Sequence, residues 1–289
     1  TVDGTTWRPA NYDGQYVGDI SVRDAIAHSR NIPAVLLAER VGYPDLQSFY
    51  QRLGLAGATR LPSSALGAFE ATPMEVAGAY TVFPGAGIAS QPRLLRAVTD
   101  SEGVALVNDE PISIRRASAR AAFLATSVLQ SVMSDGTGSK ASSFGATGEL
   151  GGKTGTTDDF RDAWFVGFSS ELSVAVWVGF DKGGSTGLSG SRAALPTWSR
   201  FMAGSGTMNS PLPGPPRGVV EGDTCIGGFE DGTCTECVSE WYSDGFAPED
   251  GCTQDGLQAI FDGIFGPRVV LPSEQEDTPR RRRPRLWPF

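Results

Sequence analysis

The tetrapeptide Lys153-Thr154-Gly155-Thr156 is the feature that most restricts what this chain can fold into. Residues two apart in a strand share a face, so Thr154 and Thr156 are expected on one face and Lys153 with Gly155 on the other. An ammonium group and two hydroxyls can hold a carboxylate, and Gly155 leaves room for close approach. We therefore predict a strand along which a carboxylate-ended peptide docks as an extra strand.

A phosphate-binding loop is the main alternative for the same residues. That loop needs Gly-x-x-x-x-Gly-Lys-Ser/Thr followed by a helix. The position of its first glycine holds Thr147, and residues 163–166 are apolar and typical of a strand rather than a helix. The sequence therefore favours a peptide-docking strand over a nucleotide site.

Two further strands and a helix are predicted after this motif. Residues 163–168 and 172–180 are rich in Val, Trp and Phe, and residues 169–171 suit a hairpin loop. Residues 195–202 have the apolar spacing of a helix that packs back on the sheet. The side chains expected in its core-facing stripe are Leu195, Trp198, Phe201 and Met202. We expect an α/β fold in which helices flank an antiparallel sheet.

A second polar group lies upstream, at Ser29 and Asn31. Residues 22–28 predict a short helix that is broken at Asn31, and Pro33 is expected to start a second helix running to about Val41. In isolation Ser29 suits helix capping and Asn31 suits a turn. Their position favours a functional role, because Asn31 is the one asparagine of four with a serine two residues before it.

Ser-x-Asn followed much later by Lys-Thr-Gly resembles the second and third motifs of the penicilloyl-serine transferases, whose first motif is Ser-x-x-Lys. Longer stretches resemble the transpeptidase domain of class A, bifunctional penicillin-binding proteins. These stretches are residues 9–14, 27–35, 67–80, 162–167 and 177–181. The resemblance covers residues 1–204 and implies a penicillin-binding transpeptidase or serine β-lactamase-like fold.

The first motif of that family does not occur in the 289 residues. The chain's three lysines are Lys140, Lys153 and Lys182. None of them follows a serine by three residues, and acyl transfer needs a nucleophile. We expect the chain to be the C-terminal portion of a transpeptidase domain, with the nucleophile, a glycosyltransferase domain and a membrane anchor upstream.

The resemblance implies a role for each motif residue that is present. Lys153 and the hydroxyls of Thr154 and Thr156 would hold the carboxylate of a D-alanyl-D-alanine stem peptide or of a β-lactam. The backbone N–H of Thr156 would form half of an oxyanion hole. Ser29 would relay a proton toward the leaving group, and Asn31 would bond the substrate amide and orient the absent lysine.

Two neighbouring side chains invite other functional interpretations. Arg30 fills the variable middle position of the motif and is expected to face solvent. His28 is the chain's only histidine and adjoins Ser29. Adjacent residues on a helix point in different directions, so we interpret His28 as structural rather than as the base of a Ser-His pair.

The four cysteines lie in the C-terminal part of the chain: Cys225, Cys234, Cys237 and Cys252. A zinc site has one Cys-x-x-Cys in its favour but lacks a second pair and a nearby histidine. We favour two disulfides in a secreted module, with three pairings open.

The predicted organisation is a transpeptidase domain at 1–204, a Pro/Gly-rich linker at 205–222, an acidic Cys-rich module at 223–266 and a disordered Arg-rich tail at 267–289.

The charge distribution excludes some partners. The formal net charge is -9, which argues against nucleic-acid binding. No apolar run is long enough to cross a bilayer, so membrane association is expected only through an upstream anchor. The Arg-rich tail is interpreted as a solvated end, with contact to anionic lipid or wall polymer as the alternative.

Together these features predict a peptidoglycan D,D-transpeptidase that cross-links stem peptides through a serine acyl-enzyme, without cofactor or metal. The alternatives are a non-catalytic peptide-binding module that retains the docking strand and a serine β-lactamase-like hydrolase. Expected partners are stem peptides, β-lactams, and the cell-wall or division machinery. The expected location is extracytoplasmic, at the periplasmic face of the inner membrane or the cell surface.

Overall fold

The computed structural model describes residues 7–18, 20–226, 229–230, 233–248 and 252. It divides into two compact units. Unit 1 comprises Thr1–Glu221 and Trp241–Asp244, and unit 2 comprises Gly222–Glu240 and Gly245–Phe289. The Arg-rich tail expected at 267–289 lies outside the described residues, and the domain ranges given above stay predictions.

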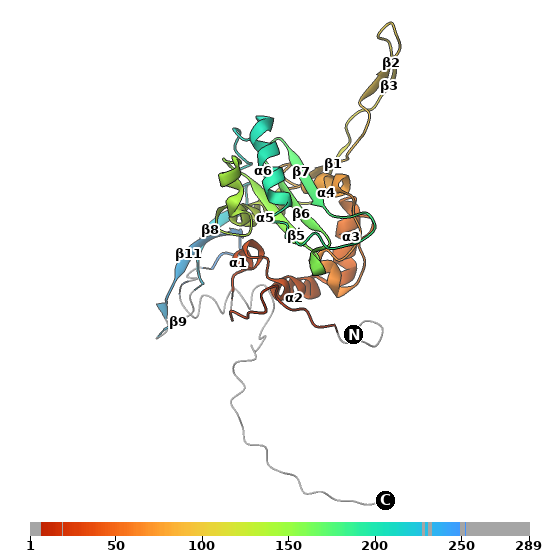
Figure 1. Cartoon of the computed structure of the whole chain (residues 1–289). Helices are drawn as coiled ribbons and strands as arrows, with labels where there is room; N and C mark the ends of the chain where they lie inside the picture. The colour runs from red at the N-terminus through yellow and green to blue at the C-terminus, as the bar shows by residue number, and fades with distance from the viewer. Residues whose placement is uncertain (1–6, 19, 227–228, 231–232, 249–251, 253–289) are drawn as a thin grey trace, which may run out of the picture. The chain divides into compact units, whose positions relative to one another are not determined.

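Unit 1 contains the helices and most of the strands (Figure 1). Its α-helices are α1 (Val22–Ala27), α2 (Asn31–Val41), α3 (Tyr43–Arg52), α4 (Pro73–Tyr80), α5 (Ala119–Ser134) and α6 (Ala194–Ser205). Short 3-10 helices are η1 (Pro62–Leu66), η2 (Ser139–Phe144) and η3 (Asp158–Phe160). The strands up to residue 178 are β1 (Ile88–Ser90), β2 (Ala97–Thr99), β3 (Ala105–Asn108), β4 (Ser113–Arg115), β5 (Gly151–Thr156), β6 (Ala163–Phe168) and β7 (Ser173–Val178).

Several helices begin at a residue whose side chain satisfies the first free backbone N–H groups. The Ser21 side chain accepts from the backbone N–H of Asp24 at the start of α1. The Ser118 side chain accepts from the backbone N–H of Ala121 at the start of α5. Helix α4 begins with a capping box formed by Thr72 and Glu75. Each of these capping contacts joins residues three positions apart, so it follows from the sequence at the start of that helix.

The central sheet has the order β5-β6-β7, and both ladders are antiparallel. The prediction of three consecutive antiparallel strands is therefore confirmed. Lys153 is paired with Val166 and Thr154 with Phe165, so the two motif residues lie on opposite faces of the sheet. Helix α6 follows directly on this sheet in the chain, as the sequence predicted.

Each face of this sheet packs against helical residues. On one face, Phe165 contacts Trp198 of α6 with ring centroids 4.8 Å apart, and both side chains are fully buried. On the other face, Phe168 stacks on Phe83 with centroids 5.6 Å apart, in a cluster that includes Val132 of α5. The sheet is thus held in place from both sides, with β5 at its edge.

The expectation that Phe201 lies in the core is wrong. Leu195, Trp198 and Met202 are fully buried, whereas Phe201 is 56% exposed. Residues three, four and seven apart share a helix face, and these spacings join the three buried residues in one stripe. Phe201 lies three residues after Trp198 but about 100° from Met202, at the margin of this stripe, and the structure leaves that margin exposed.

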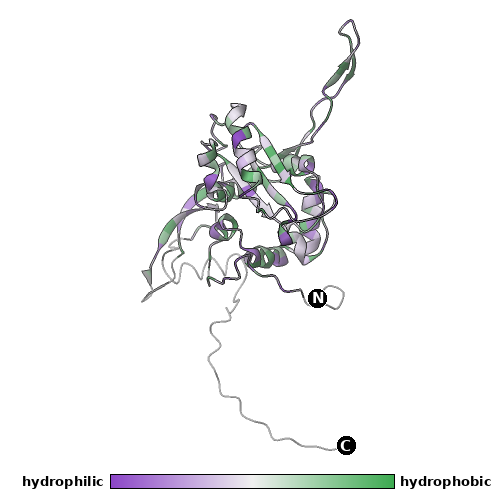
Figure 2. Cartoon of the chain, in the orientation of Figure 1, coloured by the Kyte–Doolittle hydropathy of each residue, from purple (hydrophilic) through white to green (hydrophobic). Residues whose placement is uncertain are grey.

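A hairpin extends from the rest of unit 1 (Figure 1). Strands β1 and β4 pair at its base, and β2 pairs with β3 farther out. Figure 2 shows apolar residues along β2 and β3, and the residues of both strands are exposed. Nothing in the sequence analysis anticipated this hairpin.

The last four strands are β8 (Val219–Cys225), β9 (Phe229–Glu230), β10 (Thr233–Cys234) and β11 (Cys237–Ser243). Strand β8 pairs with β11, and β9 pairs with β10. Cys225 bonds to Cys234 and Cys237 bonds to Cys252, with Cα atoms 5.6 and 5.7 Å apart. The structure thus adopts one of the three pairings that the sequence left open.

The described residues contain neither a metal-binding cluster nor a membrane-spanning helix. Within them, no group of three or more His, Cys, Asp or Glu side chains is arranged to hold a metal ion. None of the helices in that part of the chain combines the length and the hydropathy that a membrane span requires.

Candidate active site

Lys153 and Ser29 meet at the centre of the candidate site. Lys153 lies in β5, and Ser29 lies 124 residues earlier, just after α1. The Nζ of Lys153 donates to the Oγ of Ser29 at 2.7 Å and to the carbonyl oxygen of Thr154 at 3.0 Å. The fold therefore joins the two motifs that the sequence singled out.

Ser29 has an unusual backbone conformation. Its φ of +56° is left-handed, which L residues other than glycine rarely adopt and which costs about 1 kcal/mol or more. The N–H of Ser29 donates to the carbonyl of Ile26, and the N–H of Arg30 donates to that of Ala25, so the chain turns sharply at the end of α1. This turn directs the Ser29 hydroxyl toward β5.

The helix-capping interpretation of Ser29 is wrong. Helix α2 begins at Asn31 rather than Pro33, and its N-cap residue is Arg30, whose side chain makes no capping bond. The cap comes from a distant residue, Asn11. The Asn11 Oδ1 accepts from the backbone N–H groups of Asn31 at 3.0 Å and Ile32 at 3.3 Å. Ser29 is thereby left free to bond Lys153.

The protonation equilibrium of Lys153 is shifted by its surroundings. Burial disfavours its ammonium form and lowers its pKa from 10.5 to about 8. Its Nζ has hydroxyl and carbonyl acceptors, and no carboxylate lies among the hydrogen-bond partners that the described residues provide for it. A ligand carboxylate near Nζ would supply the missing negative charge and favour the ammonium form.

The two threonine hydroxyls of the motif are already engaged within the protein. The Oγ1 of Thr154 lies 2.8 Å from that of Thr137, and the Oγ1 of Thr156 accepts from the N–H of Gly190 at 3.0 Å. A hydroxyl has one donor and two acceptor positions, so the Thr156 O–H can still donate to a ligand. No sequence motif pointed to Thr137 or Gly190.

Gly190 can approach β5 because it has no side chain. A Cβ atom at this position would collide with the carbonyl oxygens of Trp164 and Gly155. The loop containing Gly190 therefore lies directly against β5 and β6. Its backbone N–H fixes the Thr156 side chain at the end of β5.

A loop at residues 10–15 holds the Ser-x-Asn motif from outside. Asn11 is buried, with 8% of its surface exposed, and its Nδ2 donates to the carbonyl of Gln15 at 2.8 Å. The Nδ2 of Asn31 donates to the carbonyl of Ala10 at 2.8 Å. Asn31 lies two residues after Ser29 in the sequence. The structure gives its side-chain N–H₂ group a backbone partner in this loop.

The expectation that Arg30 faces solvent is wrong. Its side chain is only 19% exposed and forms an ion pair with Asp13, with Nη1 and Oδ2 2.6 Å apart. The Arg30 Nε is buried without a partner among the described residues. His28, by contrast, is exposed at the end of α1. Arg30 ties the loop to the motif, which sequence reasoning missed because the two residues are 17 positions apart.

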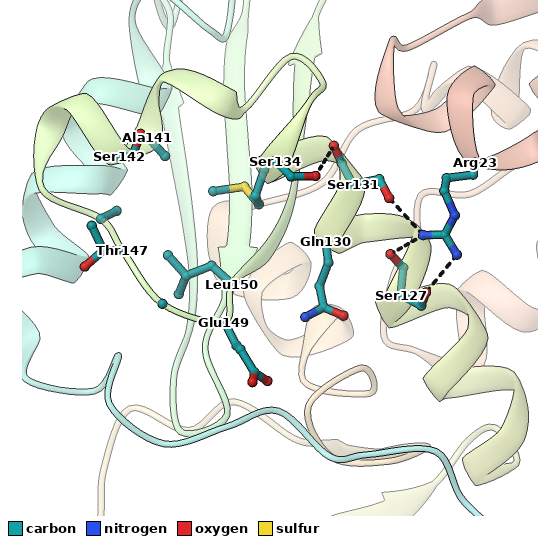
Figure 3. Close-up of a pocket in the computed structure, with 13 residues that line it drawn as sticks. Arg23, Ser127, Gln130, Ser131, Ser134, Ala141, Ser142, Thr147, Glu149 and Leu150 are labelled. Carbon is teal, nitrogen blue, oxygen red and sulfur yellow. Dashed lines mark hydrogen bonds between the residues drawn. The ribbon is translucent and has the colours of Figure 1, made fainter. Parts of the chain in front are cut away.

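A separate pocket of about 560 Å³ lies between α1, α5 and residues 141–150 (Figure 3). Arg23 points toward Ser127 and Ser131 of α5. Its guanidinium donates to the Ser127 carbonyl at 2.7 Å and to the hydroxyls of Ser127 and Ser131, both at 2.8 Å. Neither Ser29 nor Lys153 lines this pocket.

Comparison with known families gives a match over most of the chain. Residues 1–202 match the family described as the penicillin binding protein transpeptidase domain. Penicillin-binding protein 1A of Aquifex aeolicus is 38% identical over 201 residues, which cover 69% of this chain and 27% of that protein. The protein of the same name from Neisseria flavescens is 34% identical over 230 residues, covering 75% of this chain and 28% of that protein.

Solved structures give a similar result. Penicillin-binding protein 1A from Haemophilus influenzae has a TM-score of 0.75 at 25% identity, over 86% of this chain and 43% of that one. The PonA1 protein from Mycobacterium tuberculosis in complex with penicillin V has a TM-score of 0.61 at 22% identity, over 72% and 62%. The latter likeness concerns the fold alone. The chain spans about a quarter of the length of the curated relatives described above.

Proposed function

Because the chain belongs to the penicillin-binding protein transpeptidase family, we propose that it carries the carboxylate-docking and proton-relay half of a peptidoglycan D,D-transpeptidase site. The observation that carries this proposal is the 2.7 Å hydrogen bond from Lys153 to Ser29. It joins the Ser-x-Asn and Lys-Thr-Gly motifs into one site. The serine nucleophile and its lysine would come from residues outside these 289.

The docking half is β5. Its outer edge has no partner strand among the described residues, so a stem peptide can add there as a strand. The Lys153 ammonium and the Thr156 hydroxyl would hold the terminal carboxylate, with Thr156 at the end of the strand that the peptide follows and Lys153 three residues before it. Thr154 supports them through its bond to Thr137. The Thr156 backbone N–H would contribute to the oxyanion hole.

The proton-relay half is Ser29 with Lys153. A lysine with a pKa of about 8 exchanges protons near neutral pH more readily than an exposed lysine does. Its hydrogen bond to Ser29 provides a direct path between the two side chains. Ser29 could then pass a proton to the leaving amine, while Asn31 orients the substrate amide through its side-chain oxygen.

The biological setting forms part of the same proposal. The substrates are D-alanyl-D-alanine stem peptides, and β-lactams bind because they carry a carboxylate beside a reactive amide. The reaction takes place outside the cytoplasm, where the Cys225–Cys234 and Cys237–Cys252 bonds persist. Cell-wall or division proteins would be further partners, and an upstream segment would provide the membrane anchor.

Covalent labelling with a fluorescent penicillin tests this proposal. We expect no label on the 289-residue chain, because it contains no Ser-x-x-Lys, and a stoichiometric label on a longer form of the protein that includes that motif. The labelled residue, identified by mass spectrometry, should be the serine of Ser-x-x-Lys. A label on any serine within residues 1–289 would contradict the proposal.

A further inference from the structure

The β2–β3 hairpin carries apolar side chains that nothing in the described residues covers. Leu94 is 86% exposed, Leu106 is 64% exposed and Leu95 is 60% exposed. Strands β2 and β3 pair only with each other in the part of the chain that the structure describes. A two-stranded ribbon is marginally stable in water, and exposed apolar patches mark interaction surfaces.

The backbone of β2 has a free edge of defined register. The N–H of Asp109 donates to the carbonyl of Arg96, and the N–H of Asp100 donates to that of Val104. Arg96 and Asp100 thus direct their backbone groups at β3. Backbone direction alternates along a strand, so the residues between them, Ala97 and Thr99, direct theirs outward.

The β-bulge of this hairpin leaves that free edge regular. The register shifts between Val98, which is paired with Val107, and Thr99, which is paired with Ala105. The extra residue, Leu106, therefore belongs to β3. Strand β2 keeps its two-residue alternation and can pair with another strand along its whole length.

The charges of β2 are complementary to those of a second copy. Arg96 precedes Val98 by two residues and Asp100 follows it by two, so all three side chains lie on one face. In an antiparallel pair of two β2 strands centred on Val98, Arg96 lies opposite Asp100 of the partner subunit. The Oδ1 of Asp100 accepts from the backbone N–H groups of Glu102 and Val104, both at 2.9 Å, so Oδ2 is the oxygen that pairs with the arginine. The two-fold axis repeats this pair, so both arginines and both aspartates are matched.

The same register satisfies the free backbone groups. Ala97 lies opposite Thr99 of the partner subunit, and both residues present outward N–H and C=O groups. Val98 then faces Val98 of the partner subunit in a position without backbone hydrogen bonds, where side chains approach most closely. A lipid surface fits less well, because the tip of the hairpin carries Asp100 and Glu102.

We propose that β2 is a self-association surface through which two copies of the chain pair antiparallel, centred on Val98. The result is a four-stranded sheet with the order β3-β2-β2-β3. The pairing covers the free edge of β2 and extends the two-stranded ribbon to a size that is stable in water. This inference does not depend on the proposed transpeptidation.

Cysteine cross-linking of the full 289-residue chain tests the register. The four native cysteines are paired in disulfides, so one added cysteine is the single free thiol. Val98→Cys should give a disulfide-linked dimer on mild oxidation, seen on a non-reducing gel. Asn108→Cys, placed in β3 away from the axis, is the matched control. Equal cross-linking of the two variants would overturn the proposal.

A charge swap tests the complementarity by sedimentation velocity. Arg96→Asp should weaken dimerisation by about tenfold or more, because aspartates then face each other twice. Asp100→Arg should weaken it at least as much, because it also removes the acceptor of the turn bonds from Glu102 and Val104. The double variant restores opposite pairs and should dimerise at least about threefold more tightly than either single variant. A parent chain that is monomeric at about 100 μM, a concentration at which even weak dimers form, overturns the proposal, as does a double variant no better than the single ones.

Discussion

Within the described residues, strands β5 and β2 both present an unpaired backbone edge, but the protein supports these edges differently. Behind β5 lie two more strands, the buried ring of Trp198 on one face and the cluster around Phe168 on the other. Behind β2 the described part of the chain places β3 alone, and both strands are exposed. A pre-ordered edge binds a ligand without a further ordering cost, whereas an unsupported edge gains its order from its partner.

The difference also concerns charge. At β5 the half-buried Lys153 lies beside neutral acceptors, and the described residues place no carboxylate among its hydrogen-bond partners, so a substrate can bring the missing anion. At β2 a cation and an anion flank Val98, so a second copy supplies the complement of each. The same structural feature, an open strand edge, therefore fits a carboxylate-ended peptide in one place and an identical strand in the other.

The largest expected effect concerns the support behind β5. Trp198→Ala should lower the free energy of unfolding by about 3–5 kcal/mol, because it leaves a large cavity under Phe165. Leu106→Ala, in the hairpin, should change it by less than about 0.5 kcal/mol because Leu106 is exposed. Urea denaturation measures both values. Equal losses would show that the two edges do not differ in their support.

The next effect concerns the charge at β5. In a longer form of the protein that includes Ser-x-x-Lys, Lys153→Ala should slow acylation by a β-lactam about a hundredfold, because the charge that fixes the carboxylate is lost. Lys140→Ala is the matched control, since Lys140 is exposed on η2. Stopped-flow acylation rates decide the matter. A Lys153→Ala rate within about threefold of the parent would exclude β5 as the docking edge.

The pH dependence of stability tests the burial of Lys153. Its pKa is about 8 in the folded chain and 10.5 as its ordinary value, so between these values the unfolded chain binds more protons. Stability should therefore rise with pH across this window, by about 1 kcal/mol per pH unit, and the burial penalty is present in full below pH 8. Lys153→Met should lack this rise in urea denaturation at several pH values. Parallel profiles for the two proteins would refute the shift.

The smallest effect concerns the loop that holds the Ser-x-Asn motif. Asn11→Ala removes the cap of α2 and should cost about 1–2 kcal/mol of stability. Asn11→Asp keeps the acceptor oxygen but loses the Nδ2 donor to the Gln15 carbonyl, so it should recover part of this loss. Asn108→Ala in the hairpin serves as an unrelated control. Thermal unfolding measures all three. A loss as large for Asn11→Asp as for Asn11→Ala would mean that capping is not the role of Asn11.

Much of the sheet and part of the site were predictable from the sequence. The strands at β5, β6 and β7 and helix α6 follow from short-range patterns, since each depends on side-chain spacing over a few residues. Ser29 and Lys153 were found through their motifs. Phe201 was placed wrongly because the width of the buried stripe depends on what packs against α6, which spacing alone does not specify.

The sequence by itself determined the chemical groups of this protein: one lysine, a serine, an asparagine and two threonines in two recognisable motifs. Only the tertiary structure decided how they are used. It placed Lys153 against Ser29 across 124 residues, assigned the cap of α2 to Asn11 and positioned Gly190 beside Thr156. Local propensity acts over a few residues, whereas these contacts form only when distant segments close on a common core. For the same reason the hairpin and its free edge became visible only in the folded chain.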